Sequence, residues 1–289
     1  MREDSTELKP FAWSYSGARL FDSCPRAFFY RYQATSPSEE TGNNAFDPET
    51  EYIGSPGALV GTAVHQSIGR EIDSWRKGGS PSMKGAQSFA TEIIRQYCDT
   101  HDFSVEDGEN ATDAHTRHDP PRIQDSLSRT ANSHLQTFFQ VIWPQFTSHQ
   151  YILHETTDSI SVHRHIALVR PDLCTRDSDG RLVITDWKTG PIDRQDQSTQ
   201  LEVYALWAHR NYEPDLNRIT VQRVHTGTGE FDRVAINRQQ IDELIERIIS
   251  DCEDWNSRRS RSEFPTNPEP LKCHRCPYLQ QCNDGQNII

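Results

Sequence analysis

The sequence lacks any long run of apolar residues, and this absence excludes several classes of protein. Hydrophobic residues make up 34% of the 289-residue chain, and none of their runs approaches the roughly 20 residues that a helix needs to cross a bilayer. No apolar segment typical of secretory signals follows the N-terminus. A G-x-x-x-x-G-K-[ST] motif is also absent, which argues against a helicase motor. We therefore expect a soluble, cytoplasmic protein without a membrane partner.

Lysine is scarce as well. Only five of the 30 basic residues are lysines, and 42 acidic residues bring the net charge to -12. An acidic, lysine-poor surface suits a cytoplasm of high salt concentration, where charge repulsion is screened. A GC-rich genome, which favours arginine codons, explains the composition equally well. The acidic total argues against indiscriminate nucleic-acid binding but leaves room for a local basic groove.

The hydrophobic periodicity changes near residue 150, from helical spacing to strand-like alternation. We predict helices over 14–21, 26–32, 58–77, 83–98, 123–142, 197–210 and 239–256, and strands over 151–157, 161–169, 182–187, 219–225 and 230–236. This order predicts an α/β core with a helical lobe on its N-terminal side. It divides the chain into a flexible tail (1–10), a helical lobe (11–150), the α/β core (151–256) and a cysteine-bearing C-terminal segment (257–289), with loops over 34–57 and 101–122.

Two carboxylates and a lysine form the most informative pattern. Val169-Arg-Pro-Asp172 is followed, after thirteen intervening residues, by Asp186-Trp-Lys188. A hairpin would place Asp172 near the end of one strand and Asp186 near the end of the next, and paired carboxylates suit a hard divalent cation. Asp186 and Lys188 are two residues apart on one strand, so they share a face. On its own such a tripeptide is common on protein surfaces, so its weight depends on the motifs around it.

Four motifs together resemble the RecB-like branch of the PD-(D/E)XK nuclease superfamily. They are Gly61-Thr-Ala-Val-His65, Arg-Pro-Asp172, Ile-Thr-Asp186-Trp-Lys188-Thr-Gly and Gln200-Leu-Glu-Val-Tyr204-Ala-Leu. The resemblance implies a restriction-endonuclease-like mixed sheet flanked by helices, with residues 151–256 as the nuclease core. The chain departs from the pattern at Val169, where many members have glycine.

The resemblance also implies roles for individual residues. His65, Asp172 and Asp186 would bind Mg²⁺ or Mn²⁺, with Asp172, Asp186 and Lys188 as the catalytic residues. Gln200 and Tyr204, which share one helical face, would brace the site or contact DNA. Glu155, on the preceding predicted strand, is a further acidic candidate.

Seven cysteines form a second pattern. Cys273, Cys276 and Cys282 lie close to the C-terminus, and Cys24 stands about 250 residues earlier. The odd count and the C-x-x-C pair favour a metal site over disulfides. Four thiolates suit either a 4Fe-4S cluster or Zn²⁺, and spacing alone does not separate the two. Cys98, Cys174 and Cys252 are predicted to be non-ligand residues.

The split cysteine set is similar to the iron–sulfur staple of CRISPR-associated adaptation nucleases and AddB-type nuclease domains. This similarity implies a structural 4Fe-4S cluster, with Zn²⁺ as the alternative, that ties the N-terminal helical lobe to the C-terminus. Such a tie would close a very long loop.

The resemblance implies a metal-dependent DNA nuclease, either an exonuclease or an end-processing enzyme. It would favour single-stranded or free-ended DNA and leave 5′-phosphate products. DNA is the expected partner, together with a protein partner in DNA repair, CRISPR adaptation or antiviral defence. Two other classes stay open. One is a non-cleaving module that binds DNA or a partner on the same fold, although the complete acid–acid–lysine set argues against it. The other is a redox-sensing iron–sulfur protein that binds DNA.

Overall fold

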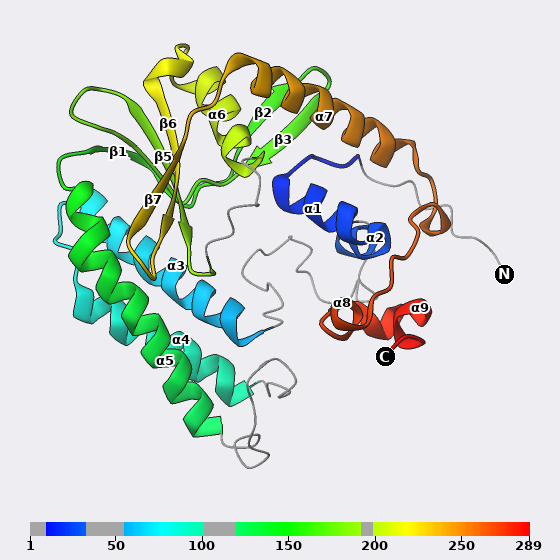
Figure 1. The fold of residues 1–289 in the computed structure, drawn as a ribbon, viewed down its shortest axis with the longest axis horizontal. Helices are drawn as coiled ribbons and strands as arrows, with labels where there is room; N and C mark the ends of the chain where they lie inside the picture. Colours follow the sequence, from blue (N-terminus) through cyan, green and yellow to red (C-terminus); the bar gives the residue numbers. More distant parts are fainter. Residues whose placement is uncertain (1–9, 33–54, 101–119, 192–198) are drawn as a thin grey trace. The chain divides into compact units, whose positions relative to one another are not determined.

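The computed structural model describes residues 10–32, 55–100, 120–191 and 199–289 (Figure 1). Most of the predicted tail 1–10 and of the loops 34–57 and 101–122 therefore lies outside the described residues. The chain forms two compact units. The first contains the described residues of Met1–Gly54 with Ser159–Val169 and Asp242–Ile289, and the second those of Ser55–Asp158 with Arg170–Ile241. Across the described ranges, no helix has the length and apolar character of a membrane span.

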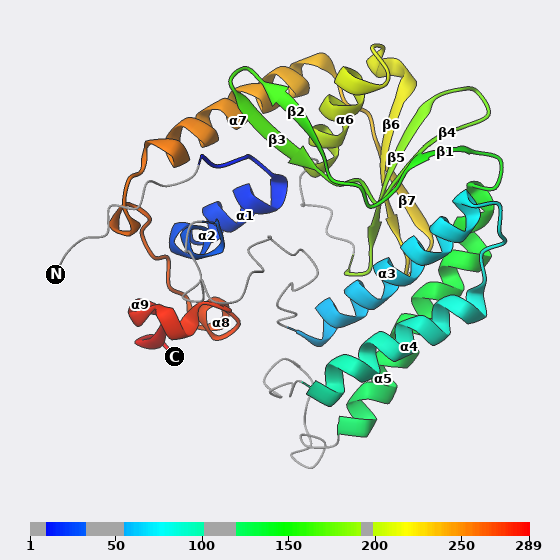
Figure 2. The same ribbon diagram turned by 180° about the vertical axis from the view of Figure 1, so that it is seen from behind.

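Three long helices open the second unit and lie alongside one another in both views (Figures 1 and 2). They are α3 (Pro56–Arg76), α4 (Met83–Thr100) and α5 (Pro120–Thr137). The start of α3 follows from local chemistry, because the side chain of Ser55 accepts a hydrogen bond from the amide of Ala58 and a proline occupies the first helical position. Beyond α5 the chain continues as a π-helical turn, η4 (Phe138–Ile142), and a short 3-10 turn, η5 (Trp143–Gln145). The predicted helices in this region are confirmed.

A five-stranded sheet completes the second unit, in the order β1-β4-β5-β6-β7. The strands are β1 (Gln150–Leu153), β4 (Leu173–Arg176), β5 (Leu182–Lys188), β6 (Ile219–His225) and β7 (Glu230–Val234). β5 and β6 pair in parallel, whereas the other three pairs are antiparallel. Parallel neighbours require a crossover, and helix α6 (Thr199–Asn211) lies in it. The predicted mixed α/β fold is thereby confirmed.

The β4–β5 hairpin brings the two predicted aspartates together. Its turn includes Gly180, whose φ of 73° lies in the left-handed region that glycine tolerates. Leu173 pairs with Thr185, so Asp172, directly before β4, lies across from Asp186. Both carboxylates therefore reach the same end of the sheet.

Alternation along β5 separates its polar and aromatic side chains. Asp186 and Lys188 share one face, and the intervening Trp187 points to the other. There Trp187 is buried against Phe138 and Phe146, with ring centroids 5.5 and 5.7 Å away. This aromatic packing holds the end of β5, where Asp186 and Lys188 lie, in place.

The single strand predicted over 161–169 is wrong. The structure has two strands there, β2 (Asp158–Val162) and β3 (His165–Val169), which form a separate two-stranded sheet. His163 turns the chain between them with a φ of 53°. A strand that the sequence pattern did not reveal, β4, then carries the chain into the hairpin. Asp172 therefore precedes the strand that pairs with β5 and does not end the strand before it.

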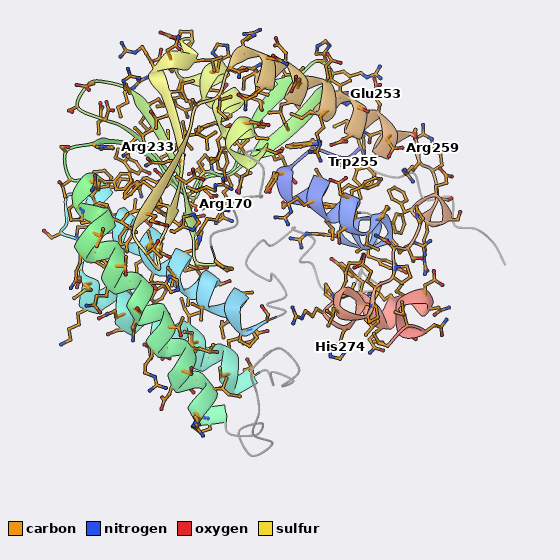
Figure 3. The ribbon with its side chains drawn as sticks, in the orientation of Figure 1. Arg170, Arg233, Glu253, Trp255, Arg259 and His274 are labelled. Atoms are coloured by element: carbon orange, nitrogen blue, oxygen red, sulfur yellow. The ribbon has the colours of Figure 1, made fainter. Side chains whose placement is uncertain are left out.

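The first unit joins an N-terminal and a C-terminal segment around an aromatic core. Its helices are α1 (Tyr15–Ser23), α2 (Pro25–Tyr32), most of α7 (Arg238–Ser257), α8 (Pro270–His274) and α9 (Asn283–Gln286). Phe28 is buried against Phe11, Phe264 and Trp255, the last labelled in Figure 3. Sequence analysis missed α8 and α9, because a helix of four or five residues has too few positions to show a periodicity.

Candidate metal centre

Three side chains from different elements converge in the second unit. A donor atom from each of His65, Glu155 and Asp172 lies within 4.8 Å of the other two. His65 lies on α3, Glu155 follows β1 and Asp172 precedes β4. The structure thus brings together two of the predicted metal residues, and Glu155, named above only as a further candidate, joins them.

Asp172 is held in place by the hairpin itself. Its carboxylate is buried, and Oδ2 accepts a hydrogen bond of 2.6 Å from the backbone N–H of Trp187. The same oxygen lies 3.6 Å from Nδ1 of His65. Strand pairing therefore fixes the orientation of this carboxylate toward the other donors.

Asp186 lies beside this set and forms an ion pair with Lys188. Nζ of Lys188 is 2.7 Å from Oδ2 of Asp186. The side chain of Gln200 bridges them: Oε1 accepts from Lys188 Nζ and Nε2 donates to Asp186 Oδ1, both at 2.9 Å. Because an ammonium only donates and a carboxylate only accepts, these two contacts fix the orientation of the amide. Among the described residues, Asp186 falls outside the tightest donor set.

Tyr204 extends this network to the backbone. Its hydroxyl accepts a hydrogen bond from Gln200 Nε2 and donates one to the carbonyl oxygen of Arg170, each 3.1 Å long. Burial, together with the charge of Asp186, raises the pKa of Tyr204 well above its ordinary value, so the phenol keeps its proton. Gln200 and Tyr204 thus belong to one hydrogen-bond network with Asp186 and Lys188.

Glu155 reaches the cluster from a strained turn. Its φ of 47° is left-handed, a conformation that costs a residue other than glycine roughly 1–2 kcal/mol. Its N–H donates to the carbonyl of Pro171 at 3.0 Å, and Oε2 lies 3.0 Å from Nε of Arg170 in an ion pair. Such strain persists where the surroundings fix it, often at functional sites. The alternation that predicted a strand over 151–157 carries no signal for this turn.

Two acids at the site, Glu155 and Asp186, hold protons more tightly than usual. Burial and then the charge of Asp172 raise the pKa of Glu155 to about 7. The same two causes raise the pKa of Asp186 to about 6, although Lys188 opposes them. Burial opposes a charge on His65, but the carboxylates around it, Asp172 first, outweigh burial and raise its pKa to about 9. Crowded negative charge with oxygen and imidazole donors fits a hard divalent cation.

Gly61 allows α3 to approach the end of β5. A Cβ at this position would lie 3.1 Å from Oγ1 of Thr189, which follows Lys188. Gly61 is about one helical turn before His65. The glycine of the Gly61-x-x-x-His65 motif therefore has a steric reason, since a side chain there would crowd the hydroxyl of Thr189.

Thr226 supports the backbone of Lys188, and sequence analysis missed it. The N–H and the hydroxyl of Thr226 both donate to the carbonyl of Lys188, at 2.9 and 3.1 Å. The hydroxyl has then used its only proton, so its 2.9 Å contact with Nδ1 of His134 must be a bond that the imidazole donates. These hydrogen-bonded residues come from α5, the end of β5 and the segment after β6. No local sequence pattern could therefore reveal the role of Thr226.

Replacing Thr226 with valine should destabilise the second unit, because the change leaves Nδ1–H of the half-buried His134 without its acceptor. We expect the free energy of unfolding, measured by urea denaturation, to fall by about 1 kcal/mol. Thr226→Ser keeps the hydroxyl and should retain most of the stability. Equal stability of the valine and serine variants would contradict the assigned hydrogen bonds.

The four predicted cluster cysteines, all in the first unit, line one cavity of ≈ 640 Å³. Burial raises the pKa of the Cys276 thiol, and the other three cysteines add to this rise. The N–H of Gly285 donates to Sγ of Cys282 at 3.4 Å. Among the described residues, no three cysteine sulfurs lie within 4.8 Å of one another.

Hydrogen bonds also join the segments that carry these cysteines. The hydroxyl of Tyr30 donates to the carbonyl of Gln281 at 2.7 Å, and Nζ of Lys272 donates to the carbonyl of Ser23 at 3.0 Å. The two segments are therefore in direct contact through residues other than the cysteines.

Comparisons with known proteins agree with the motifs. The family model described as the PD-(D/E)XK nuclease superfamily matches residues 12–283. No curated protein sequence matches the chain significantly. One solved structure, titled "Crystal structure of SSO0001", is 16% identical, and its match covers 57% of this chain and 74% of that one with a TM-score of 0.29. A likeness at this level does not establish a shared fold.

Proposed function

Because the chain belongs to the PD-(D/E)XK nuclease superfamily, we propose that it is a divalent-metal-dependent deoxyribonuclease. The observation that carries the proposal is the convergence of His65, Glu155 and Asp172 within 4.8 Å of one another. The Asp186–Lys188 ion pair, 2.7 Å long, lies beside them. Metal-assisted hydrolysis of a phosphodiester requires ligands for a cation and a positive charge near the phosphate. The converging donors would supply the first and the ammonium of Lys188 the second.

The proposed reaction is hydrolysis of a DNA phosphodiester. Water forms the new bond to phosphorus while the bond from phosphorus to the 3′ oxygen breaks. The 3′ oxygen leaves as a hydroxyl after gaining a proton, and the phosphate stays on the 5′ end. The chemistry that a bound Mg²⁺ or Mn²⁺ supplies is Lewis acidity, which neutralises charge on the phosphate and makes water a stronger nucleophile.

The side chains divide this work between them. His65, Asp172 and Asp186 would hold the cation, with Glu155 as a fourth ligand. Lys188 would hold an oxygen of the phosphate or the attacking water, and so stabilise the charge that develops.

Two further residues would position this machinery. Gln200 keeps the ammonium of Lys188 in place through its bridging amide, and Tyr204 fixes that amide through its own hydrogen bond. Neither residue needs to touch the reacting atoms to be required.

For the cysteine cavity we propose a structural 4Fe-4S cluster bound by Cys24, Cys273, Cys276 and Cys282. The resemblance of the split cysteine set to an iron–sulfur staple supports the cluster, and Zn²⁺ bound by the same four thiolates is the alternative.

We propose an exonuclease or end-processing enzyme that favours single-stranded or free-ended DNA and acts with a protein partner in repair, CRISPR adaptation or antiviral defence. These points rest on the resemblance of the motifs alone.

The proposal is tested by digestion of DNA labelled at the 5′ or the 3′ end, as single strands, duplexes and closed circles. Anaerobically purified protein should shorten linear strands with Mg²⁺ or Mn²⁺ and should be inactive with EDTA. The labelled end that disappears first gives the polarity, and cutting of closed circles would replace the exonuclease assignment with an endonuclease. A folded, metal-loaded protein that binds these DNAs without cutting any of them would instead be a binding module.

A further inference from the structure

Arg170 stands at the edge of the candidate metal centre, in the segment Val169-Arg-Pro-Asp172. The residue is labelled in Figure 3. Its side chain is 44% exposed, and Nε lies 3.0 Å from Oε2 of Glu155, which is one of the three converging donors. A positive charge is thus held beside the metal-binding residues, with part of its surface open to solvent.

The backbone of Arg170 is fixed from two sides. Its carbonyl oxygen accepts the hydroxyl of Tyr204 at 3.1 Å. The next residue, Pro171, accepts the N–H of Glu155 with its own carbonyl at 3.0 Å. An arginine on such a backbone loses less freedom on binding a ligand than one on a loose loop.

The guanidinium itself is only partly used. Within the described part of the chain, Nη1 and Nη2 of Arg170 make no hydrogen bond. Two terminal nitrogens in a planar fork match two oxygens of a phosphate.

On the basis of the proposed function, we propose that Arg170 is a substrate-binding residue that contacts a phosphate of the DNA backbone at the metal centre. Glu155 is then a positioning residue for Arg170 as well as a candidate metal ligand. The contact involves no base, so it adds affinity for any DNA sequence. It also places the phosphate next to Lys188 and the metal donors.

The test measures DNA binding and metal binding separately. A fluorescein-labelled single-stranded oligonucleotide is titrated with protein in Ca²⁺, over a series of salt concentrations, by fluorescence anisotropy. Arg170→Ala should raise Kd about tenfold and lower the slope of log affinity against log salt by about 0.7, the share of one phosphate contact on a single strand. Arg170→Lys keeps the charge but loses the planar guanidinium. Its Kd should therefore lie between those of the native protein and Arg170→Ala.

Arg76→Ala is the matched control. Arg76 lies on α3 of the same unit, is 46% exposed and pairs with Asp73 at 3.0 Å, so it matches Arg170 in exposure and in having one acidic partner. We expect its Kd and its salt slope to equal those of the native protein. Thermal unfolding of each variant shows that the fold is kept.

Isothermal titration with Mn²⁺ separates the proposal from a purely structural role. If Arg170 only supported Glu155, its loss would weaken Mn²⁺ binding about 10- to 100-fold and leave the salt slope unchanged, and that result overturns the proposal. A native protein that cuts DNA while Arg170→Ala binds it equally well overturns this inference alone. A native protein that neither binds nor cuts DNA overturns the proposed function together with it.

Discussion

Replacing Asp172 with asparagine should reduce DNA cleavage on the order of 10³-fold, because a bound cation contributes several kcal/mol to charge stabilisation and each 1.4 kcal/mol is about tenfold in rate. Asp172 has neighbours from three other parts of the site. Its carboxylate faces His65, accepts the N–H of Trp187 and lies across the hairpin from Asp186. The effect is measured as the single-turnover cleavage rate of end-labelled single-stranded DNA in saturating Mg²⁺.

The same substitution should leave the metal-free protein as stable as before once His65 has lost its proton. The amide oxygen of asparagine can still accept from Trp187, and the change removes the charge that raises the pKa of Glu155 and of Asp186. Asp172 also raises the pKa of His65 to about 9, and this stabilisation of the protonated imidazole is lost with the charge. Above pH 9, where His65 is neutral, the melting temperature without metal should therefore not fall. Asp179→Asn, an exposed change in the turn of the same hairpin, is the control and should cut DNA at the native rate. Native-like cleavage by Asp172→Asn would refute the assigned metal centre.

Replacing Cys276 with serine should remove the proposed iron–sulfur cluster and destabilise the first unit. Cys24 and Cys276 are about 250 residues apart in the sequence. For a covalent link that closes a loop of this length, the loop-closure relation gives a fall of about 5 kcal/mol in the free energy of unfolding when the link is lost. The burial of Phe28 against Trp255 and Phe264 remains, so we expect a lower unfolding temperature and not a complete loss of structure. The measurement is iron and sulfide content with visible absorbance, followed by thermal unfolding.

Cys98→Ser provides the matched control for this experiment. Cys98 is a partly exposed free cysteine on α4, outside the cysteine cavity, and its replacement should leave the metal content unchanged. Anaerobically purified native protein should contain about four iron atoms per chain. A colourless native protein with one zinc per chain would replace the cluster with a zinc site.

The parts of the site that sequence analysis foresaw are those with a local signal. Asp186 and Lys188 share a face because strand side chains alternate, and Gln200 and Tyr204 share one because they are four apart on a helix. Asp172 could be placed near Asp186 because a short turn joins two strand-like segments, even though the strand assigned to it was wrong.

The parts that it did not foresee depend on tertiary contacts or on rare backbone conformations. Glu155 and His163 both adopt positive φ values without being glycine, so the usual sequence marker of such a turn is missing. The first turn brings Glu155 to the donor set, and the second divides a predicted strand into β2 and β3. Thr226 and His134 meet only because the sheet packs on α5.

The division into two compact units could not be predicted from the sequence either. Residues 159–169 belong with segments near both ends of the chain, through backbone pairing of Trp13 with Ile166 and Leu168. Pairing between segments more than 150 residues apart leaves no periodic trace in either of them. The linear division at residues 10, 150 and 256 remains a prediction about domains.

We propose that the metal on which cleavage depends is held by His65, Glu155 and Asp172, with Asp186 beside them. The most direct test is a crystal structure of the protein with Mn²⁺, in which the ion is located by its anomalous scattering. The strongest manganese peak in the second unit should lie in bonding distance of a nitrogen of His65 and an oxygen of Asp172. A manganese-saturated crystal with no peak between these residues would contradict the account.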